Sequence, residues 1–429
     1  MYKVALLIAL SFCLALAKHE QYNGFVLYQV EVANEQQAQQ VNALENQLGL
    51  DMWSHATPTR PGLVLVPGPM RQRFQRAIVA TGAQYEIQVE NVKEVLDLED
   101  QLLAAASQRS NRTSGRLSFD TIHRYERVDA YLVELAQKYS TVSVVSGGKS
   151  FEGRDIKYLK ISTTNFQDSS KPIIMIQSLI HAREWITLPA TLYAIEKLVV
   201  DITDRDLVDQ IDWIILPIAN PDGYEFSHTN TRFWRKNRST GHIIANICLG
   251  VDLNRNFDFL WGTLSSNSAC SDTFHGSGAF SEPETAIIRN IVNEYRSRLE
   301  LYLDIHSFGS LILYGYGNGE LPANGLTLNV VGVRMAQAID AVKWDSNPNY
   351  RVGNTALILY SVSGGASDYV QAVGIPLSLT YELPAYRNQQ NSIAGFLVDP
   401  DFIEQAGYET WEGIKSGARF VLDYYRSKK

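Results

Sequence analysis

The sequence lacks a long basic run, and its 429 residues carry a formal net charge of −8. Nucleic-acid surfaces are rich in clustered Lys and Arg, so no nucleic-acid partner is expected. Beyond its N-terminus the chain also lacks an apolar run long enough to cross a membrane, so no membrane association is expected. It contains no internal repeat and no low-complexity tract. The remaining composition, 45% hydrophobic and 20% charged, is typical of a globular protein, and the length accommodates a large domain and a smaller one.

The N-terminus has the features of a secretory signal peptide. It reads MYKVALLIALSFCLALA, in which Lys3 precedes a short apolar core that ends in Ala15-Leu16-Ala17. The small-x-small ending is the pattern of signal cleavage, and the apolar core is too short for a spanning helix. Residues 1–17 are therefore predicted to be removed, which leaves a secreted, extracellular protein. An N-terminal anchor is the alternative, and the short core disfavours it.

Cysteine is scarce, and Cys13 would leave with the signal peptide. The remaining two, Cys248 and Cys270, are predicted to form one disulfide in an oxidising compartment. Closing that loop would stabilise the fold by about 3 kcal/mol. Two free buried thiols are the alternative. Asn111 and Asn237 each begin an N-glycosylation sequon, a motif short enough to arise by chance.

Residues 25–98 have the pattern of a small separate unit. FVLYQVEV, PGLVLVPGP and AQYEIQVENV have strand patterns, whereas EQQAQQVNALENQL and RQRFQRAIVATG have helical spacing. The order βα–β–αβ predicts an open-faced α+β sandwich. The next segment, KEVLDLEDQLLAAASQ, is predicted to be a helix that leads away from this unit.

A polar stretch, SQRSNRTSGR (107–116), follows that helix. It is predicted to be an exposed linker, open to a trypsin-like protease at Arg109, Arg112 or Arg116. An ordinary linker that is never cut is the alternative. A secreted chain with a folded N-terminal unit before such a hinge indicates a zymogen. The predicted division is a prodomain with its connecting helix at 18–112 and a catalytic domain at 113–429.

From about residue 117 onward, long apolar runs alternate with helical segments such as TAIIRNIVNEYRSRL. The predicted strands are DIKYLKIS, KPIIMIQSLI, IDWIILPIA, LELYLDI and IPLSLTYEL. Apolar strands covered by helices predict an α/β fold with a mixed, largely parallel sheet and helices on both faces. Ligands of such sheets bind beyond the carboxyl ends of the strands.

HAREW (181–185) lies directly after one of these strands. The short spacing lets His181 and Glu184 reach one metal ion, and two histidines with a glutamate are a catalytic zinc set. The chain has no HExxH, so the third ligand comes from elsewhere. His306 is the best candidate, because it also follows an apolar strand. Each of these residues taken alone is more often structural.

Six segments together resemble the signature motifs of the zinc metallocarboxypeptidases of the A/B type. They occur in the family's order and spacing, and they are HAREW, ANPDGYEFSHTNTRFWRKNRS, CLGVDLNRNFD, DIHSFGSLILYGYG, LYSVSGGASD and LTYELP. The resemblance covers essentially all of residues 113–429, and the N-terminal unit is similar to that family's inhibitory prodomain. It implies one Zn²⁺ per catalytic domain and hydrolysis of C-terminal peptide bonds.

The resemblance also implies roles for individual residues at the reacting centre. His181, Glu184 and His306 match the zinc ligands, and Glu382 matches the general base. Arg235 matches the arginine that polarises the scissile carbonyl. Asp252 matches a carboxylate that fixes the tautomer of the first zinc histidine.

Further matches concern the end of the substrate. Asn254 and Arg255 match the pair that binds the terminal carboxylate, which a guanidinium grips bidentately. Tyr360 matches a mobile tyrosine that closes over the same terminus, and Arg183 matches a secondary substrate-binding arginine near the entrance.

Ser367 stands where the family usually sets its C-terminal preference. The positions that match the side-chain pocket are Leu313, Gly317, Thr355, Leu359, Val362, Gly365, Ser367 and Thr380. None carries a charge, so the expected preference is A-type, for aromatic or aliphatic residues. Two departures from the family pattern, Phe308 for a tyrosine and Pro384 for an arginine, concern subsite preference and loop geometry.

The sequence offers three alternatives to a secreted A-type enzyme. A charged residue that enters the pocket would favour B-type preference for Lys or Arg. Loss of Glu382 or of a ligand would favour an inactive binding protein, but all are present. A cell-wall amidase of related fold is disfavoured by Asn254-Arg255 and by the prodomain. Nothing in the sequence demands more than a monomer.

Overall fold

The computed structural model describes residues 18–110, 117–242, 247–385 and 395–427. The predicted signal peptide, the sequon at Asn111 and the arginines Arg112 and Arg116 lie outside these ranges. Within them, no helix is long and apolar enough to cross a membrane.

The N-terminal unit is a four-stranded sheet with helices packed on it, which confirms the predicted open sandwich. Its sheet has the order β2-β3-β1-β4 with antiparallel neighbours. The strands are β1 (Val26–Glu31), β2 (Asp51–Ser54), β3 (Gly62–Val66) and β4 (Gln84–Val89), the helices α2 (Glu35–Asn42), α3 (Leu44–Leu48) and α4 (Arg71–Thr81), and the 3-10 turns η1 (Glu20–Tyr22) and η2 (Gly68–Met70).

Two details of this unit differ from the sequence prediction. The single helix expected over EQQAQQVNALENQL is divided at Ala43 into α2 and α3, and α3 ends at Gly49, whose φ of +63° suits glycine. The strand β2 was not predicted, because four residues with polar ends show no readable alternation.

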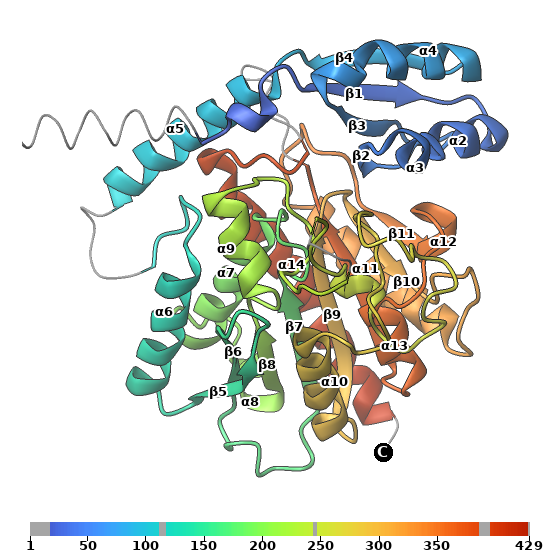
Figure 1. Ribbon diagram of the computed structural model, residues 1–429. Helices are drawn as coiled ribbons and strands as arrows, with labels where there is room; N and C mark the ends of the chain where they lie inside the picture. Colours follow the sequence, from blue (N-terminus) through green and yellow to red (C-terminus); the bar gives the residue numbers. More distant parts are fainter. Residues whose placement is uncertain (1–17, 111–116, 243–246, 386–394, 428–429) are drawn as a thin grey trace, which may run out of the picture.

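A long helix, α5 (Val92–Ser110), leads from the N-terminal unit to the rest of the chain (Figure 1). The helix was predicted, but the predicted linker beginning at residue 107 was wrong for residues 107–110, which are still helical. The run AAASQ is a good helix former, so nothing in it ends the helix.

The large domain contains an eight-stranded sheet with the order β11-β10-β12-β9-β7-β8-β6-β5. The central strands β12, β9, β7 and β8 run parallel, whereas β8–β6, β6–β5 and β10–β12 pair antiparallel. The strands are β5 (Val142–Lys149), β6 (Asp155–Ile161), β7 (Ile173–Ser178), β8 (Asp212–Leu216), β9 (Leu299–Ser307), β10 (Leu311–Tyr314), β11 (Arg351–Asn354) and β12 (Leu377–Leu383). The mixed, largely parallel sheet is therefore confirmed.

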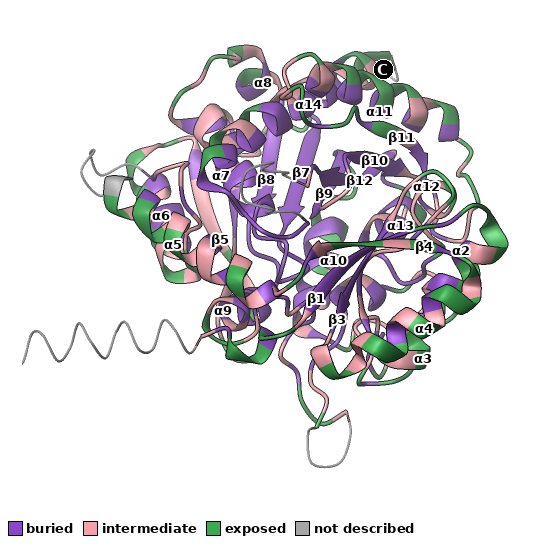
Figure 2. Ribbon diagram, turned by 90° about the horizontal axis from the view of Figure 1, so that it is seen from above, coloured by how far each residue is buried: buried purple, intermediate pink, exposed green. Residues whose placement is uncertain are grey.

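Helices cover both faces of this sheet, as predicted. One face packs against α6 (Tyr125–Lys138), α7 (Thr187–Val199), α11 (Gly325–Asp340) and α14 (Pro400–Ser427), and the other against α10 (Pro283–Tyr295) and α13 (Ala366–Ala372). Seen from above, the sheet is a buried layer between them (Figure 2). The shorter helices are α8 (Arg205–Gln210), α9 (Pro221–Thr229), α12 (Thr355–Ile358) and the 3-10 turn η4 (Leu253–Arg255).

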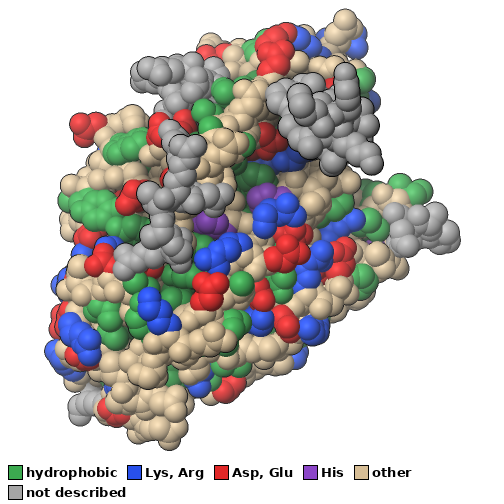
Figure 3. Space-filling model, turned by 90° about the vertical axis from the view of Figure 1, so that its left-hand side faces the viewer, with side chains coloured by type: hydrophobic (Ala, Val, Ile, Leu, Met, Phe, Trp, Pro, Cys, Tyr) green, Lys and Arg blue, Asp and Glu red, His purple; other side chains and the backbone are tan. Residues whose placement is uncertain are grey.

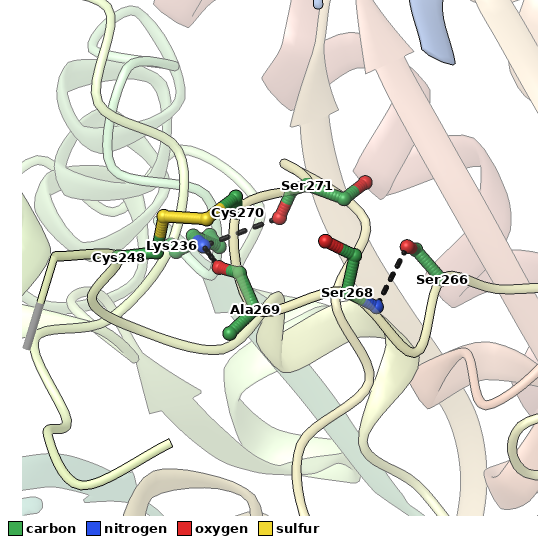
Figure 4. The surroundings of a disulfide bond; sticks show 7 residues. All are labelled: Lys236, Cys248, Ser266, Ser268, Ala269, Cys270 and Ser271. Carbon is green, nitrogen blue, oxygen red and sulfur yellow. Dashed lines mark hydrogen bonds between the residues drawn. A yellow bond between two sulfur atoms is a disulfide. The ribbon is translucent and has the colours of Figure 1, made fainter. Parts of the chain in front are cut away.

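The predicted disulfide between Cys248 and Cys270 is present (Figure 4). Beside it, the Lys236 amine donates hydrogen bonds to the carbonyl oxygens of Ala269 (2.8 Å) and Ser271 (3.1 Å). The loop that the disulfide closes is thus attached to the segment that carries Arg235.

The sequon at Asn237 is predicted to carry no glycan in the folded protein. Its side chain is fully buried: Nδ2 donates to Glu282 (2.7 Å) and Glu284 (3.1 Å), and Oδ1 accepts from the Val251 N–H (2.8 Å). A sugar on Nδ2 would break these bonds and has no room. Peptide mass spectrometry of the glycosylation-competent expressed protein, after peptide-N-glycosidase treatment in ¹⁸O-water, should find unmodified Asn237; an ¹⁸O-labelled aspartate at this position in folded protein would contradict the prediction.

Replacing Glu409 on α14 by glutamine is expected to stabilise the fold at high pH only. Burial raises the pKa of this carboxyl from 4.5 to about 7. The folded state then holds a proton that the unfolded state releases, so the free energy of unfolding falls as pH rises from about 4.5 to 7. We expect Glu409→Gln to gain up to about 3 kcal/mol at pH 8 and almost nothing at pH 4. Urea denaturation at both pH values checks this.

The matched control for this prediction is Glu404→Gln, an exposed position on the same helix. It should show no such difference between the two pH values. An equal effect of Glu409→Gln at pH 4 and pH 8 would show that the carboxyl does not hold a proton in the fold.

Candidate active site

The candidate site lies at the carboxyl edge of the central parallel strands, on the side of the domain that faces the N-terminal unit (Figure 1). His181 and Glu184 occupy the loop between β7 and α7, and His306 lies near the end of β9. Glu382, near the end of β12, is the register partner of His306. Neighbouring parallel strands therefore bring these side chains together, as the sequence predicted.

Three of the predicted residues form a compact cluster of metal-ligand atoms. The Nδ1 atoms of His181 and His306 are 3.1 Å apart, and the Glu184 carboxylate lies 2.7 Å from the first and 3.1 Å from the second. All three side chains are buried. Among the described residues, this is the one group of three or more His, Cys, Asp or Glu residues arranged to hold a metal ion. Two imidazoles and a carboxylate are a donor set that zinc accepts.

The ionisation of the cluster also fits a bound cation. Burial alone would raise the pKa of Glu184, but attraction to His181 and His306 holds that pKa well below its usual value. Burial would lower the pKa of His306, but Asp304 and Glu184 raise it well above its usual value. The surrounding carboxylates thus favour positive charge at the centre, which a dication supplies.

Asp252 lies where the resemblance placed it, behind His181. Its Oδ1 accepts from the His181 Nε2–H at 3.1 Å, while its Oδ2 accepts from Arg235 Nε (3.0 Å) and Nη2 (2.9 Å). Burial opposes the charged form, but Arg235, Arg255 and His181 hold the pKa of Asp252 well below its usual value. One carboxylate therefore orients both a ligand imidazole and the arginine beside it.

Glu382 lines the same cavity as the metal-ligand cluster. Burial, helped by the nearby Glu184 carboxylate, raises its pKa to about 7, against the opposing attraction of His306, Arg60 and Arg235. A carboxyl with a pKa near neutrality is suited to accept and return a proton.

The predicted carboxylate-binding group is assembled on another wall of the cavity. Arg255 is buried, and its Nη2 donates to the Tyr360 hydroxyl at 3.2 Å. Asn254 Oδ1 accepts from the Ala366 N–H at 2.7 Å, which fixes the amide with Nδ2 towards His306. The cavity therefore has a cationic end beside the metal cluster.

Most of the predicted side-chain pocket is also found here. Of the predicted positions, Leu313, Thr355, Leu359, Val362, Gly365, Ser367 and Thr380 line a cavity of about 80 Å³. The Ser367 and Thr380 hydroxyls are hydrogen-bonded to each other at 2.8 Å. Gly317 does not line the cavity, and its N–H donates to Asp368 Oδ2 at 2.8 Å.

The sequence prediction missed Asp368, which also lines the cavity. It follows Ser367 directly, and burial raises its pKa to about 7. A short polar run at the start of a helix gave no signal that separates a pocket residue from an ordinary acidic residue of a first helical turn. The predicted positions are uncharged, as expected. The prediction of an uncharged pocket is nonetheless incomplete, because the Asp368 carboxyl also lines the cavity.

The N-terminal unit covers the site. Trp53, Ser54 and Arg60 line the cavity together with the metal cluster. Asp51 Oδ1 accepts from Arg183 Nη1 at 2.8 Å, and the His55 ring meets Tyr360 edge-on with 4.7 Å between ring centres. Arg183 does not line the cavity; its Nη1 donates to Asp51 and also to the carbonyl oxygen of Phe233.

The helix α5 is anchored through a buried ion pair that the sequence did not indicate. Glu99 accepts two hydrogen bonds from Arg232, at 2.8 and 3.0 Å, and both side chains are fully buried. Arg232 also donates to the carbonyl oxygen of Arg183 and lies 3.5 Å from the Trp185 ring centre. This pair is buried. On the surface shown in Figure 3, basic and acidic side chains are interspersed.

Of the two departures from the family pattern, Phe308 lines the cavity and packs edge-on against Phe396, with 4.9 Å between ring centres. Pro384 is buried directly after β12. The loop that follows it lies mostly outside the described residues, so the expectation for its geometry stays a prediction.

Comparison with known proteins gives consistent matches over nearly the whole chain. A family described as zinc carboxypeptidase matches residues 128–413, and one described as carboxypeptidase activation peptide matches residues 28–99. A carboxypeptidase B of Helicoverpa zea is 46% identical over 428 residues, 98% of this chain and 99% of that protein. Carboxypeptidase A1 of Bos taurus is 33% identical over 92% of this chain and 93% of its own. A crystal structure of carboxypeptidase A from Helicoverpa armigera matches with a TM-score of 0.91 and 63% identity, over 94% of this chain and 98% of that one.

Proposed function

The chain belongs to the zinc carboxypeptidase family, and from that premise we propose that it is a secreted zymogen whose mature form removes aromatic or aliphatic C-terminal residues. The observation that carries the proposal is one cavity that holds the His–Glu–His cluster, Glu382 and Arg255 together. An inactive binding homologue is disfavoured because every one of these groups is in place.

Zinc bound by His181, Glu184 and His306 would supply Lewis acidity next to the scissile carbonyl. Glu382 would take a proton from the attacking water and return it to the leaving amine. Arg235, held by Asp252, would donate to the oxygen on which negative charge develops; one such fixed donor contributes about 3 kcal/mol of barrier lowering.

The C-terminal carboxylate would be recognised by Arg255 and Asn254, with Tyr360 closing over it. A guanidinium matches a carboxylate with two parallel hydrogen bonds, so this contact selects a free chain end. An amidated end would leave Arg255 buried without its partner. This explains why the site acts on the last peptide bond.

The A-type preference rests on the neutral positions around Ser367. Leu313, Leu359 and Val362 give the cavity apolar walls. B-type preference is the second candidate, favoured by the Asp368 carboxyl in the wall and by the name of the Helicoverpa zea relative. The hydrogen bond from Gly317 and the raised pKa of Asp368 argue that this carboxyl is committed to the fold rather than to a substrate cation.

The experiment that tests this function uses trypsin-treated protein with and without a zinc chelator. Blocked dipeptides that end in Phe, Leu, Lys or Glu are compared, together with amidated versions. Chelator-sensitive release of Phe or Leu from free ends only is the expected result. Preferential release of Lys would keep the mechanism and overturn the pocket assignment. No release from zinc-loaded, cleaved protein would favour the inactive homologue.

The zymogen proposal divides the chain into a signal peptide (1–17), a prodomain with its connecting helix (18–112) and a catalytic domain (113–429). A trypsin-like protease would cut within 107–116. Arg109 lies inside α5, and a helical backbone does not fit the extended binding mode of such proteases, so Arg112 and Arg116 are the preferred sites. A monomer is sufficient for every part of this proposal.

A further inference from the structure

Asp304 is a fully buried acidic residue in the middle of the central sheet. It lies two residues before His306 on β9, so both side chains project from the same face of the strand. Its register partners are Gln177 on β7 and Thr380 on β12. A polar row thus runs across three parallel strands directly beneath the row that carries His306 and Glu382.

The contacts of Asp304 lead to His306. Oδ1 accepts a hydrogen bond from Gln177 Nε2 at 2.8 Å, which fixes the carboxylate from the neighbouring strand. Oδ2 lies 2.9 Å from His306 Nε2. Among the described residues this oxygen has no well-aligned hydrogen-bond donor, so the contact is electrostatic and leaves Oδ2 free to accept.

The tautomer of His306 determines whether Nε2 carries the ring proton and therefore requires a hydrogen-bond acceptor. Its Nδ1 faces Glu184 and His181, so a metal ion there leaves the ring proton on Nε2. The Asn254 amide is 3.4 Å from Nε2, but its Nδ2 is itself a donor and its oxygen is taken by Ala366. Asp304 Oδ2 is then the acceptor that the geometry offers.

The two ligand histidines are therefore supported in parallel ways. Each presents Nδ1 to the cluster and Nε2 to a buried carboxylate. Asp252 accepts a hydrogen bond from His181, whereas Asp304 Oδ2 lies 2.9 Å from His306 Nε2 without hydrogen-bond alignment. The charge of Asp252 is balanced by Arg235. In the part of the chain that the structure describes, the one ion pair of Asp304 is with His306, so its charge acts on this ring alone.

We propose that Asp304, held by Gln177, is a positioning residue that orients His306 and strengthens its bond to zinc. A carboxylate on the far nitrogen fixes the ring, selects the tautomer and makes the ligand nitrogen more basic. The inference rests on the proposed ligand role of His306. The acidic residue serves metal retention rather than proton transfer, since it does not line the cavity.

The test measures zinc affinity of the full-length, uncut chain by competition with a chromophoric chelator. Asp304→Asn keeps the shape but removes the charge, and Asp304→Leu removes charge and acceptor together. We expect the zinc dissociation constant to rise about 10- to 100-fold in both variants. The matched control is Asp222→Asn, which neutralises a fully buried carboxylate that lies outside the metal cluster. It should leave the zinc dissociation constant unchanged.

Thermal unfolding of the metal-free proteins separates positioning from a purely structural role. A weaker zinc affinity with an unaltered metal-free midpoint supports the proposal. Wild-type affinity in both Asp304 variants would overturn it, and so would an affinity loss that merely follows a lowered midpoint. His306→Ala tests the premise separately: if it binds zinc as tightly as wild type, the ligand assignment itself fails.

Discussion

Replacing Glu382 by glutamine is expected to lower kcat by about 10³- to 10⁴-fold, with zinc still bound. Glutamine has the shape of the carboxylate but cannot accept a proton from the attacking water. Glu382 is not one of the three residues of the metal cluster, so its neutralisation leaves the ligand set intact. Trypsin-treated variant and wild type should be compared with a blocked Phe dipeptide, and zinc content measured by mass spectrometry.

The matched control is Glu409→Gln, a buried glutamate whose pKa burial also raises to about 7, on the helix α14 behind the sheet. It should retain wild-type kcat. Activity of Glu382→Gln within tenfold of wild type, at full zinc occupancy, would remove Glu382 from the role of general base. In the wild type, kcat/KM should fall as pH decreases through the pKa of Glu382, because the protonated carboxyl accepts no proton.

The elements that the sequence predicted are those with long, one-sided or continuous apolar patterns. β7 and β9 are buried along their whole length, and their apolar runs made them readable as central strands of a parallel sheet. β10 and β11 have four residues each, and β5 is interrupted by a Gly-Gly pair just before its last residue. Such short or interrupted segments become strands because they can pair with strands that are already in the sheet. A local sequence pattern carries no information about that pairing.

The same distinction applies to the site. His181, Glu184 and His306 were predictable because each stands at or just after the end of an apolar run, where the carboxyl edge of a sheet collects side chains. Asp304 precedes His306 inside the strand, and its role depends on a neighbour, Gln177, that is distant in sequence. Its Asp-x-His spacing on one face of a strand was the signal that sequence reasoning overlooked. Arg232 and Asp368 carried no comparable signal.

The contacts of the N-terminal unit explain how an activation peptide can inhibit this enzyme. Its β2 region supplies Asp51 to Arg183, His55 to Tyr360 and Arg60 to the cavity wall near Glu382. Arg183 and Tyr360 are proposed to bind substrate, and Glu382 is proposed to transfer the proton. The N-terminal unit therefore occupies the approach to the site instead of distorting the metal cluster, whose ligand atoms remain together.

It follows that the uncut chain should already bind zinc but hydrolyse little. If the covered state is populated to 99%, the activity of the uncut chain is about 1% of that after cleavage within 107–116. Timed trypsin digestion, with activity and fragment masses followed together, checks this. Variants with the linker arginines replaced by glutamine, singly and together, identify the bond whose cleavage releases activity. Full activity of uncut protein would contradict the zymogen assignment.

Asp51→Ala should raise the activity of the uncut chain about tenfold or more, because it leaves the buried Arg183 guanidinium without the carboxylate that balances its charge. The cost falls on the covered state alone, since Arg183 regains water when the N-terminal unit moves away. Activity after full cleavage should not change, because Asp51 belongs to the removed segment. Glu86→Ala, an exposed position on β4 of the same unit, is the control and should keep the uncut chain silent. If Asp51→Ala were equally silent, the buried pair of Glu99 with Arg232 would be sufficient to hold the cover, and Glu99→Gln would then be the variant that opens it.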